Sequence, residues 1–316
     1  MKRYCILLIC ILIFKNTYSQ LNLVPNPSFE DTLYCPFGLT QIDAAIGWSS
    51  YRNSPDYYNG CNITNSVTVP NSNFGYQFAN SGFAYSGVAT YYKFNSPSGN
   101  NYREYLGAML SVPLQVGTKY YFSFYAVLAE RNTGFSSNNL GLRFFVNSYS
   151  LSNPAPLDNF SHLKFDSLLI DSINWQRISG SFVADSIYQY VSIGNFYNYL
   201  NTDTIIVTPF ATAAYFFIDD ICVTTDSLYN ETWTGLNNIE QREVNVWPNP
   251  VQDYVQFKSE KIIQEIIISD SRGSVLDRQT LNSRDEKIDL SGLANGIYFV
   301  TFRSKEGFTH RKLVKN

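Results

Sequence analysis

The sequence predicts an all-β protein of two units, an N-terminal jelly-roll β-sandwich and a small C-terminal immunoglobulin-like β-sandwich. Aromatic residues make up 16% of the 316 residues, with 24 Tyr and 23 Phe, and such side chains suit a pleated sheet. Charged residues also amount to only 16%, and short apolar runs alternate with Asn, Ser, Gly and Pro clusters that are typical of turns. The length is sufficient for two ordinary domains.

The composition excludes several classes of function. The chain has only two histidines, His162 and His310, so a metal site built from several histidines cannot form. The formal net charge of −3 provides no basic surface of the kind that binds nucleic acid. We therefore expect no nucleic-acid partner.

The first 19 residues have the pattern of a secretory signal peptide. Met1, Lys2 and Arg3 give a positive start, residues 4–14 are an apolar run, and Thr17 and Ser19 are small residues suited to cleavage before Gln20. The apolar run is too short for a comfortable membrane span. We expect residues 1–19 to be removed and the exported protein to have no transmembrane span; the alternative is an uncleaved anchor.

Three cysteines follow the signal peptide. Export permits disulfides, and Cys35 and Cys61 form the natural pair, because both lie in segments rich in Pro, Gly and Asn. Cys222 lies in an apolar strand pattern and is predicted to be a buried free thiol, although spacing does not exclude a pairing through it.

Residues 20–226 are predicted to form one β-sandwich domain. Strand patterns cover residues 120–128, 142–146, 188–193 and 215–223, and no convincing long helix interrupts them. Many short strands separated by turn residues over this length favour a sandwich or jelly roll. This domain holds 8 basic and 14 acidic residues, whereas residues 244–316 hold 11 and 9, so the two units differ in composition.

The two ends of this domain, Asn22–Glu30 at the start and Phe217–Val223 at the end, carry a family resemblance. They resemble the first and last strands of the galactose-binding-like jelly rolls, a fold that includes many carbohydrate-binding modules. In that superfamily a Glu of the first strand and an Asp of the last strand often hold a structural calcium, which here implies Glu30 and Asp219. Calcium takes several oxygen ligands, but both carboxylates could instead accept backbone or Arg hydrogen bonds. Strand alternation predicts that Asp220 points to the opposite face.

Four segments in the middle of the domain carry a further resemblance, namely residues 54–61, 74–77, 82–87 and 102–106. They are similar to a group of secreted or surface proteins from Bacteroidetes, and the resemblance implies no particular activity. Its aromatic and polar residues suggest a platform on which sugar rings stack, with an Arg–Glu pair fixing hydroxyl groups. The predicted ligand-binding residues are Trp48, Tyr57, Tyr58, Tyr91, Arg103 and Glu104. The competing interpretation is that the aromatic side chains belong to the core.

No catalytic motif is present in the sequence. We find no Gly-x-Ser-x-Gly elbow, Gly-rich phosphate loop or His-Glu-x-x-His helix. Glu104 and Glu130 are candidates for a glycoside hydrolase only because the domain has few Glu residues.

Residues 227–243 have linker composition, and residues 244–316 form the second unit. Three short motifs occur in order in the second unit: Pro248-Asn249-Pro250, Leu293 to Gly296 with Tyr298, and Lys312-Leu313-Val314. With these motifs, residues 244–316 closely resemble the type A C-terminal sorting domain of type IX secretion cargo from Bacteroidetes. Gly296 is expected at a turn with positive φ, and Tyr298 is expected to anchor the next strand. The resemblance implies handling by the type IX machinery and a secreted or outer-membrane cell-surface location.

Taken together, the sequence favours a non-catalytic, exported binding protein, with carbohydrate as the preferred ligand class by analogy of fold. A surface adhesion or envelope protein that binds other proteins is the alternative. A glycoside hydrolase is the third possibility.

Overall fold

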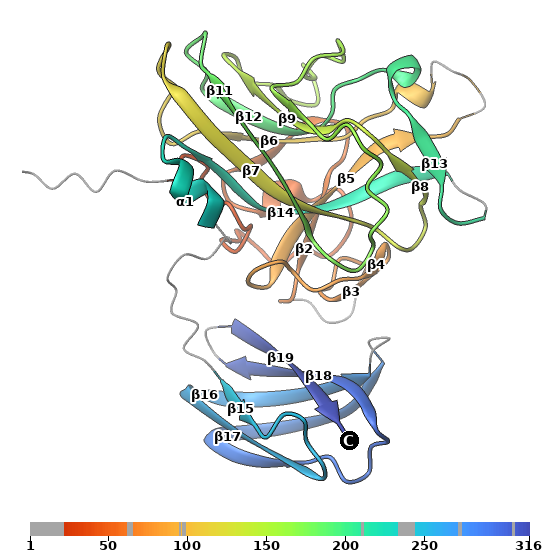
Figure 1. Cartoon of the computed structure of the whole chain (residues 1–316), viewed down its shortest axis with the longest axis vertical. Helices are drawn as coiled ribbons and strands as arrows, with labels where there is room; N and C mark the ends of the chain where they lie inside the picture. The colour runs from red at the N-terminus through yellow and green to blue at the C-terminus, as the bar shows by residue number, and fades with distance from the viewer. Residues whose placement is uncertain are drawn as a thin grey trace, which may run out of the picture.

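The computed structural model describes residues 22–61, 66–94, 96, 99–209, 212–232, 244–270, 274–304 and 307–316. The predicted signal peptide, residues 1–19, lies outside the described residues. The chain is all-β, as predicted, and Figure 1 shows its two units. The first unit, residues 22–232, is called the cargo domain, and the second unit, residues 244–316, is called the tail.

The cargo domain is a sandwich of a five-stranded and a seven-stranded sheet. The five-stranded sheet contains, in spatial order, β1 (Trp48–Arg52), β6 (Tyr105–Met109), β12 (Tyr190–Asn195), β9 (Leu140–Phe145) and β10 (Leu163–Lys164). The seven-stranded sheet contains β11 (Gln176–Val183), β7 (Lys119–Leu128), β14 (Ala213–Thr224), β5 (Ala84–Tyr92) and β2 (Asp56–Asn59), with β8 (Gly134–Ser137) beside β14 and β13 (Thr204–Ile206) beside β8. Smaller elements are the hairpin β3 (Asn71–Ser72) and β4 (Gly75–Tyr76), the 3-10 helices η1 (Ile42–Ala44), η2 (Gly99–Asn101) and η3 (Tyr199–Asn201), and α1 (Ser227–Thr232).

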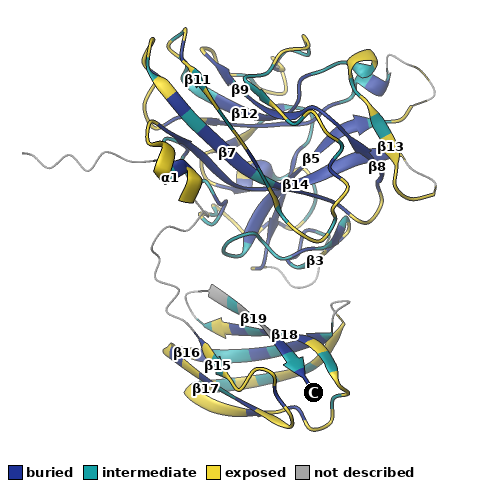
Figure 2. Cartoon of the chain, in the orientation of Figure 1, coloured by how far each residue is buried: buried dark blue, intermediate teal, exposed yellow. Residues whose placement is uncertain are grey.

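Strand alternation builds the core between the two sheets. Leu106, Val191 and Phe144 of the five-stranded sheet face Phe124 and Ile218 of the seven-stranded sheet in one buried cluster. β14 is the central strand, and all 12 of its residues are buried between β5 and β7 (Figure 2). Such complete burial explains its two apolar stretches, residues 213–218 and 221–223, because neither face of the strand meets water.

A bulge in β14 overturns the expected orientation of Asp220. The register with β7 shifts between Asp219 and Cys222, and Asp220 has a φ of 52°. An extra residue in one strand breaks the two-residue alternation of side chains. Asp219 and Asp220 are therefore both buried and turn toward the same loop, so the prediction of opposite faces is wrong.

Tyrosine rings lie flat over glycines on the outer faces of both sheets. A Cβ on Gly107 would fall 2.2 Å from the Tyr51 ring, one on Gly194 2.4 Å from the Tyr105 ring, and one on Gly87 2.3 Å from the Tyr215 hydroxyl. Only glycine leaves room for this close approach. The outer faces thereby acquire aromatic layers of their own.

The outer face of the seven-stranded sheet around β2, β5 and β14 is covered by residues 66–79, here called the strap. Phe74 of the strap stacks on Tyr215, with ring centroids 4.1 Å apart and planes 4° from parallel. The strap is held by Tyr76 N–H donating to Glu130 (3.1 Å) and by the Trp175 indole donating to the Phe78 carbonyl (2.9 Å). This part of the face is consequently buried.

The predicted linker 227–243 begins with an ordered element instead. Ser227–Thr232 form α1, whose Asn230 is buried against β7. The Ser123 hydroxyl donates to the Asn230 side chain (3.0 Å), and Arg177 donates to the Asn230 carbonyl (2.7 Å). These bonds attach residues 227–232 to the cargo domain; residues 233–243 lie outside the described residues.

The tail is an antiparallel five-stranded sheet around its own core. Its strands are β15 (Asn245–Trp247), β16 (Tyr254–Asp270), β17 (Val275–Asp289), β18 (Gly296–Ser304) and β19 (Gly307–Lys315). The long strand β16 pairs with β15 in its first part, with β18 in its second part, and with β17 along its length. Val255, Phe257, Ile266 and Val300 lie in the enclosed cluster. Within the described ranges the only α-helix, α1, has six residues. No helix among the described residues is therefore long and apolar enough to cross a bilayer.

We predict that Gly107→Ala destabilises the cargo domain by about 1–3 kcal/mol, because the new methyl group overlaps the Tyr51 ring. Urea unfolding measures this change. Gly38→Ala is the matched control, since nothing lies within 4 Å of its Cβ position. Equal effects of the two substitutions would contradict the ring-over-glycine packing.

Candidate functional site

The six residues predicted to bind a ligand all lie in the interior. Their relative exposures are at most 6%: Trp48 2%, Tyr57 0%, Tyr58 0%, Tyr91 6%, Arg103 0% and Glu104 6%. The expectation of an exposed stacking platform is therefore wrong. Trp48 packs 4.8 Å from the Phe29 ring and donates to the Asn26 carbonyl (2.9 Å), and the Tyr57 hydroxyl donates to the Phe29 carbonyl (2.8 Å).

Tyr58 and Glu104 belong to a buried polar network beneath the strap. The hydroxyls of Tyr58 and Tyr215 lie 3.0 Å apart, and the Tyr215 hydroxyl donates to Asp56. Glu104 accepts hydrogen bonds from the Ala89 N–H (2.8 Å) and from the hydroxyls of Tyr102 (2.9 Å) and Ser54 (3.0 Å). Burial, and then the charge of Asp56, raises the pKa of Glu104 to about 8.

Arg103 is a buried cation that binds backbone carbonyl groups. Its guanidinium donates to the carbonyls of Asn100 (2.7 Å), Tyr102 (2.8 Å) and Tyr197 (3.2 Å), and it lies 5.7 Å from the centroid of the Tyr91 ring. Burial lowers the pKa of Arg103 to about 10. Its donors hold the loops around η2 and η3 together and are not directed at solvent.

Glu30 and Asp219 meet at one place, as the resemblance implied, and Asp220 joins them. All three carboxylates hold the loop before β5. Glu30 Oε1 accepts from the N–H groups of Phe83 (2.8 Å) and Ala84 (3.0 Å). Asp219 Oδ2 accepts from the N–H groups of Asn80 (2.8 Å) and Ser81 (3.2 Å), and Asp220 accepts from the Ser81 hydroxyl (2.6 Å).

The surroundings of this acidic cluster are tightly fitted. Gly82 has a φ of +67°, and a Cβ there would fall 2.2 Å from Glu30 Oε1. Phe29, the residue before Glu30, has a φ of 62°, which is an unusual conformation for a bulky side chain. Burial raises the pKa of Glu30 to about 8, with the charges of Asp220 and Asp31 adding to it, and burial raises the pKa of Asp220 to about 6.

Calcium binding at this cluster stays a prediction. Carboxylate oxygens are the ligands calcium prefers, but the contacts of Glu30 and Asp219 are with N–H donors. In the described part of the chain, no three acidic, Cys or His side chains converge so as to hold one metal ion. The raised pKa values of Glu30 and Asp220 favour protonated carboxyl groups in this cluster when no metal is bound.

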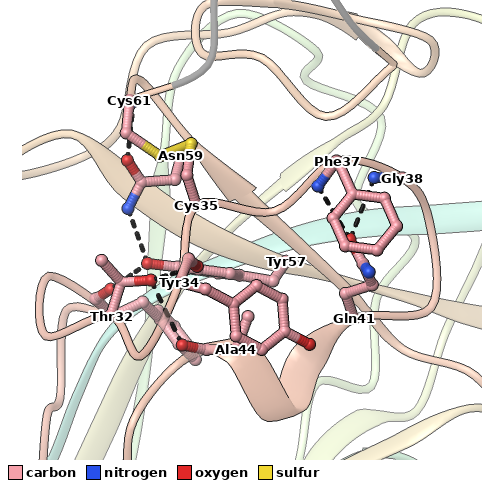
Figure 3. The surroundings of a disulfide bond; sticks show 11 residues. Thr32, Tyr34, Cys35, Phe37, Gly38, Gln41, Ala44, Tyr57, Asn59 and Cys61 are labelled. Atoms are coloured by element: carbon pink, nitrogen blue, oxygen red, sulfur yellow. Dashed lines mark hydrogen bonds between the residues drawn. A yellow bond between two sulfur atoms is a disulfide. The ribbon is translucent and has the colours of Figure 1, made fainter.

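The predicted disulfide is confirmed. Cys35 and Cys61 are joined with their Cα atoms 5.9 Å apart (Figure 3). Cys222 is a buried free thiol, as expected, and burial raises the pKa of this thiol to about 12. Such a thiol has little thiolate at neutral pH and is correspondingly unreactive.

The structure reveals an open aromatic patch that the sequence interpretation missed. On the outer face of the five-stranded sheet, Tyr149 and Tyr190 lie half-buried next to the buried Tyr51, with ring centroids 6.3 and 6.4 Å from it. In the described part of the chain neither Tyr149 nor Tyr190 uses its hydroxyl in a hydrogen bond within the protein. Because most of the longer strands of the domain carry aromatic residues, composition does not distinguish this pair, and only the packing of residues 146–160 does.

Arg143 and Asp158 lie beside this patch. Arg143 Nη2 is 2.9 Å from Asp158 Oδ2, and the guanidinium lies 4.8 Å from the centroid of the Phe145 ring. The side chain of Asp158 remains 47% exposed. The hydrogen bond from Arg143 lowers the pKa of Asp158, so its carboxylate is ionised at neutral pH. We call Tyr51, Tyr149, Tyr190, Arg143 and Asp158 the tyrosine patch.

The sorting marks of the tail come together around the end of β19. Asn249 Oδ1, between Pro248 and Pro250, accepts from the Val314 N–H (2.9 Å), and Leu313 is buried in the tail core. The Tyr298 hydroxyl donates to the Ala294 carbonyl (2.6 Å), which ties the Leu293 segment to β18. The side chain of Lys312 lies outside the described residues. Gly296 begins β18 opposite Lys315 without a positive φ, so that expectation is wrong.

Residues 245–316 match the family model described as the secretion system C-terminal sorting domain. The tail is a secretion sorting domain. The match confirms the resemblance drawn from the three sequence marks, and it places the protein among exported proteins, secreted or at the cell surface.

No curated protein matches the sequence. Among solved structures, the CBM22-1–GH10 modules of Clostridium thermocellum xylanase 10B share 15% identity at a TM-score of 0.32, over 57% of this chain and 26% of that chain. The CBM22-1–CBM22-2 tandem of Paenibacillus barcinonensis Xyn10C shares 10% identity at a TM-score of 0.32. This match covers 90% of this chain and 86% of that chain. The K3 cleaved adhesin domain of Porphyromonas gingivalis Lys-gingipain shares 15% identity at a TM-score of 0.28. This match covers 55% of this chain and 94% of that chain. The chain thus spans about a quarter of the xylanase, and the low TM-scores leave its function to its own residues.

We predict that the cargo domain loses stability between pH 6.5 and 8.5, with a fall in Tm of about 10 °C. The pKa of Glu30 in the folded state is about 8 against an ordinary value of 4.5, and that of Glu104 is likewise about 8. The folded state therefore binds protons that the unfolded state has released, and raising the pH favours unfolding. His162 acts in the opposite direction, because burial lowers its pKa from 6.5 to about 4 in the folded state. Its contribution therefore raises stability between pH 4 and 6.5 and is constant above that range.

Differential scanning calorimetry with and without calcium measures this dependence. The Glu30→Gln variant is the control, because its side-chain carbonyl can still accept from Phe83 and Ala84 while the titration is removed; its Tm should fall less. Millimolar calcium that raises the Tm at pH 8.5 in the wild type, but not in Asp219→Asn, would establish the metal. A Tm that rises toward pH 8.5 without calcium would contradict the protonated cluster.

Proposed function

We propose that this protein is an exported, non-catalytic binding protein and that its ligand is carbohydrate, bound at the tyrosine patch. The observation that carries the proposal is the pair of half-exposed rings, Tyr149 and Tyr190, beside the Arg143–Asp158 ion pair. Sugar rings have apolar C–H faces and hydroxyl edges. Ligand sites of this chemistry combine aromatic surfaces with a few placed polar groups.

The polar groups of the patch have the capacities that hydroxyl groups need. The Tyr149 and Tyr190 hydroxyls can donate and accept, and the ionised Asp158 carboxylate accepts. Arg143 also donates to the Phe160 carbonyl (3.0 Å), so the guanidinium is fixed from two sides. A sugar hydroxyl at the exposed side of Asp158 would therefore meet an oriented acceptor.

The floor of the patch is held rigid before any ligand binds. Tyr51 lies flat over Gly107, and its carbonyl accepts from the Ala155 N–H (2.9 Å). Arg52 donates to the Ala155 carbonyl (2.8 Å), which binds residues 146–160 to the edge strand β1. Preformed geometry reduces the entropy lost on binding.

The two carboxylates considered for hydrolysis do not support an active site. Glu104 is buried and accepts three hydrogen bonds, so its oxygens are engaged inside the protein. Glu130 lies 3.3 Å from the Arg131 guanidinium and holds the strap through the Tyr76 N–H. Glycoside hydrolysis needs two carboxyl groups flanking one bond, and these two serve other structural tasks.

We predict that Tyr149→Ala and Tyr190→Ala each weaken glycan binding by about tenfold or more, because each removes a contact ring. The full chain is first tested on a broad polysaccharide panel, and the best ligand is measured by isothermal titration calorimetry. Tyr34→Ala is the matched control, since Tyr34 is 38% exposed on another surface. A blank panel, or binding unchanged in both variants, would reject the proposed function.

Trp48→Ala provides a second control of a different kind. Because Trp48 is a core residue, we expect a loss of about 3–5 kcal/mol in stability rather than a selective loss of binding. Chemical denaturation separates the two effects. A stable variant with abolished glycan binding would instead restore Trp48 as a ligand contact.

A further inference from the structure

A second surface of the cargo domain is formed by residues 31–46, here called the disulfide loop. It carries four exposed large hydrophobic side chains: Phe37 71%, Leu33 70%, Ile46 50% and Tyr34 38% exposed. The Tyr34 and Phe37 rings lie 6.3 Å apart. The tyrosine patch shares no residue with this loop, so the two surfaces are independent.

The disulfide loop is fixed in one conformation by polar and covalent ties. The Cys35–Cys61 bond joins it to the end of β2, and Gln41 Oε1 accepts from the N–H groups of Phe37 (2.8 Å) and Gly38 (3.0 Å) (Figure 3). The Thr32 hydroxyl lies within hydrogen-bond distance of the carbonyls of Tyr34 (2.6 Å) and Ala44 (3.2 Å).

Backbone bonds complete the restraint. Leu33 N–H donates to the Ala44 carbonyl (2.8 Å), and Ile46 N–H donates to the Asp31 carbonyl (2.9 Å). The Thr40 N–H donates to Asp56 Oδ1 (2.6 Å), which connects the loop to the buried network. None of these ties uses the side chains of Leu33, Phe37 or Ile46, so the fold does not need those apolar groups.

We propose that the disulfide loop is a docking surface for a partner protein that offers an apolar pocket with a basic rim. Rigid apolar anchors surrounded by polar groups have the composition of interface hot spots. Residues 31–46 contain two acidic residues, Asp31 and Asp43, both exposed, and no Lys, Arg or His. Charge complementarity therefore selects a basic rim and disfavours an anionic membrane.

A sugar ligand fits this loop less well than a protein pocket. Leu33 and Ile46 are aliphatic and present no ring face for stacking. The Thr32 hydroxyl and the Gln41 carbonyl oxygen are already bonded within the loop. A protein pocket instead uses the aliphatic and aromatic groups together.

The test is photo-crosslinking in the full chain, produced in cells that export it. The variant Phe37→p-benzoylphenylalanine is compared with Ile173→p-benzoylphenylalanine, because Ile173 is 75% exposed elsewhere. We expect a crosslinked protein only from position 37, with the crosslinked peptide mapped by mass spectrometry to an apolar site flanked by Lys or Arg. Leu33→Asp in the same background should reduce the yield about tenfold or more without changing the Tm, since Leu33 contributes little to the core.

Each other outcome overturns the proposal. Crosslinking at position 37 no stronger than at position 173 shows that no partner docks there. Attachment to a second copy of this chain, to polysaccharide or to lipid identifies a different occupant. Tyr149→Ala should leave the crosslink unchanged, so failure of the glycan proposal and failure of this one are distinguishable.

Discussion

Two adjacent carboxylates on the most buried strand constrain the rest of the cargo domain. Strand β14 carries Asp219 and Asp220 into the interior at a bulge, where water cannot solvate them. Burying such groups is unfavourable unless hydrogen bonds or protons compensate. The loop of residues 80–84 supplies these hydrogen bonds, and Glu30 binds the same loop from the N-terminal segment.

The N-terminal segment is hydrogen-bonded to β14 immediately after the two carboxylates, at Ile221 and Val223. Asn22 donates to the Ile221 carbonyl (2.8 Å) and accepts from the Val223 N–H (3.0 Å), while Ile221 N–H donates to the Pro27 carbonyl (2.9 Å). The N-terminal segment, the central strand β14 and the loop before β5 are thus joined by hydrogen bonds. Loss of the carboxylate hydrogen bonds would destabilise all three segments.

The two outer faces of the sandwich differ because different segments cover them. Tyrosine rings over glycines line both faces, but the strap covers the seven-stranded sheet around β2, β5 and β14, with Phe74 on Tyr215. Residues 146–160 cover the five-stranded sheet only in part and leave Tyr149 and Tyr190 half-exposed. The proposed carbohydrate site follows from this asymmetry, and export by the tail brings that face to the outside of the cell.

The sequence was most informative where a pattern is local or carries a specific chemistry. The all-β class followed from composition, the disulfide from export and turn residues, and the tail from three short marks near the end of the chain. The meeting of Glu30 and Asp219 followed from a resemblance at both ends of the domain. The predicted orientation of the Asp220 side chain was wrong because a bulge breaks the alternation of the strand. The residue types around it do not indicate where such a bulge occurs.

The ligand residues were misjudged for a different physical reason. Trp48 and Tyr57 sit in segments rich in turn residues, which suggested exposure, but both lie on strands, β1 and β2, and both side chains are buried. Conversely, the exposure of Tyr149 and Tyr190 depends on how far residues 146–160 extend across the sheet. Long-range packing of this kind has no periodic signal in a sequence so rich in tyrosine.

Native-state hydrogen exchange on the full chain tests the central role of the carboxylate cluster most directly. We expect the amides of the loop before β5 to exchange as slowly as those of Phe216–Ile218 in β14, although they precede or only begin a strand. These loop amides are those of Asn80, Ser81, Phe83 and Ala84. All of them should then require global opening of the cargo domain. Exchange of the loop amides at the fast rate of exposed turns, with β14 still protected, would show that the cluster does not hold the domain together.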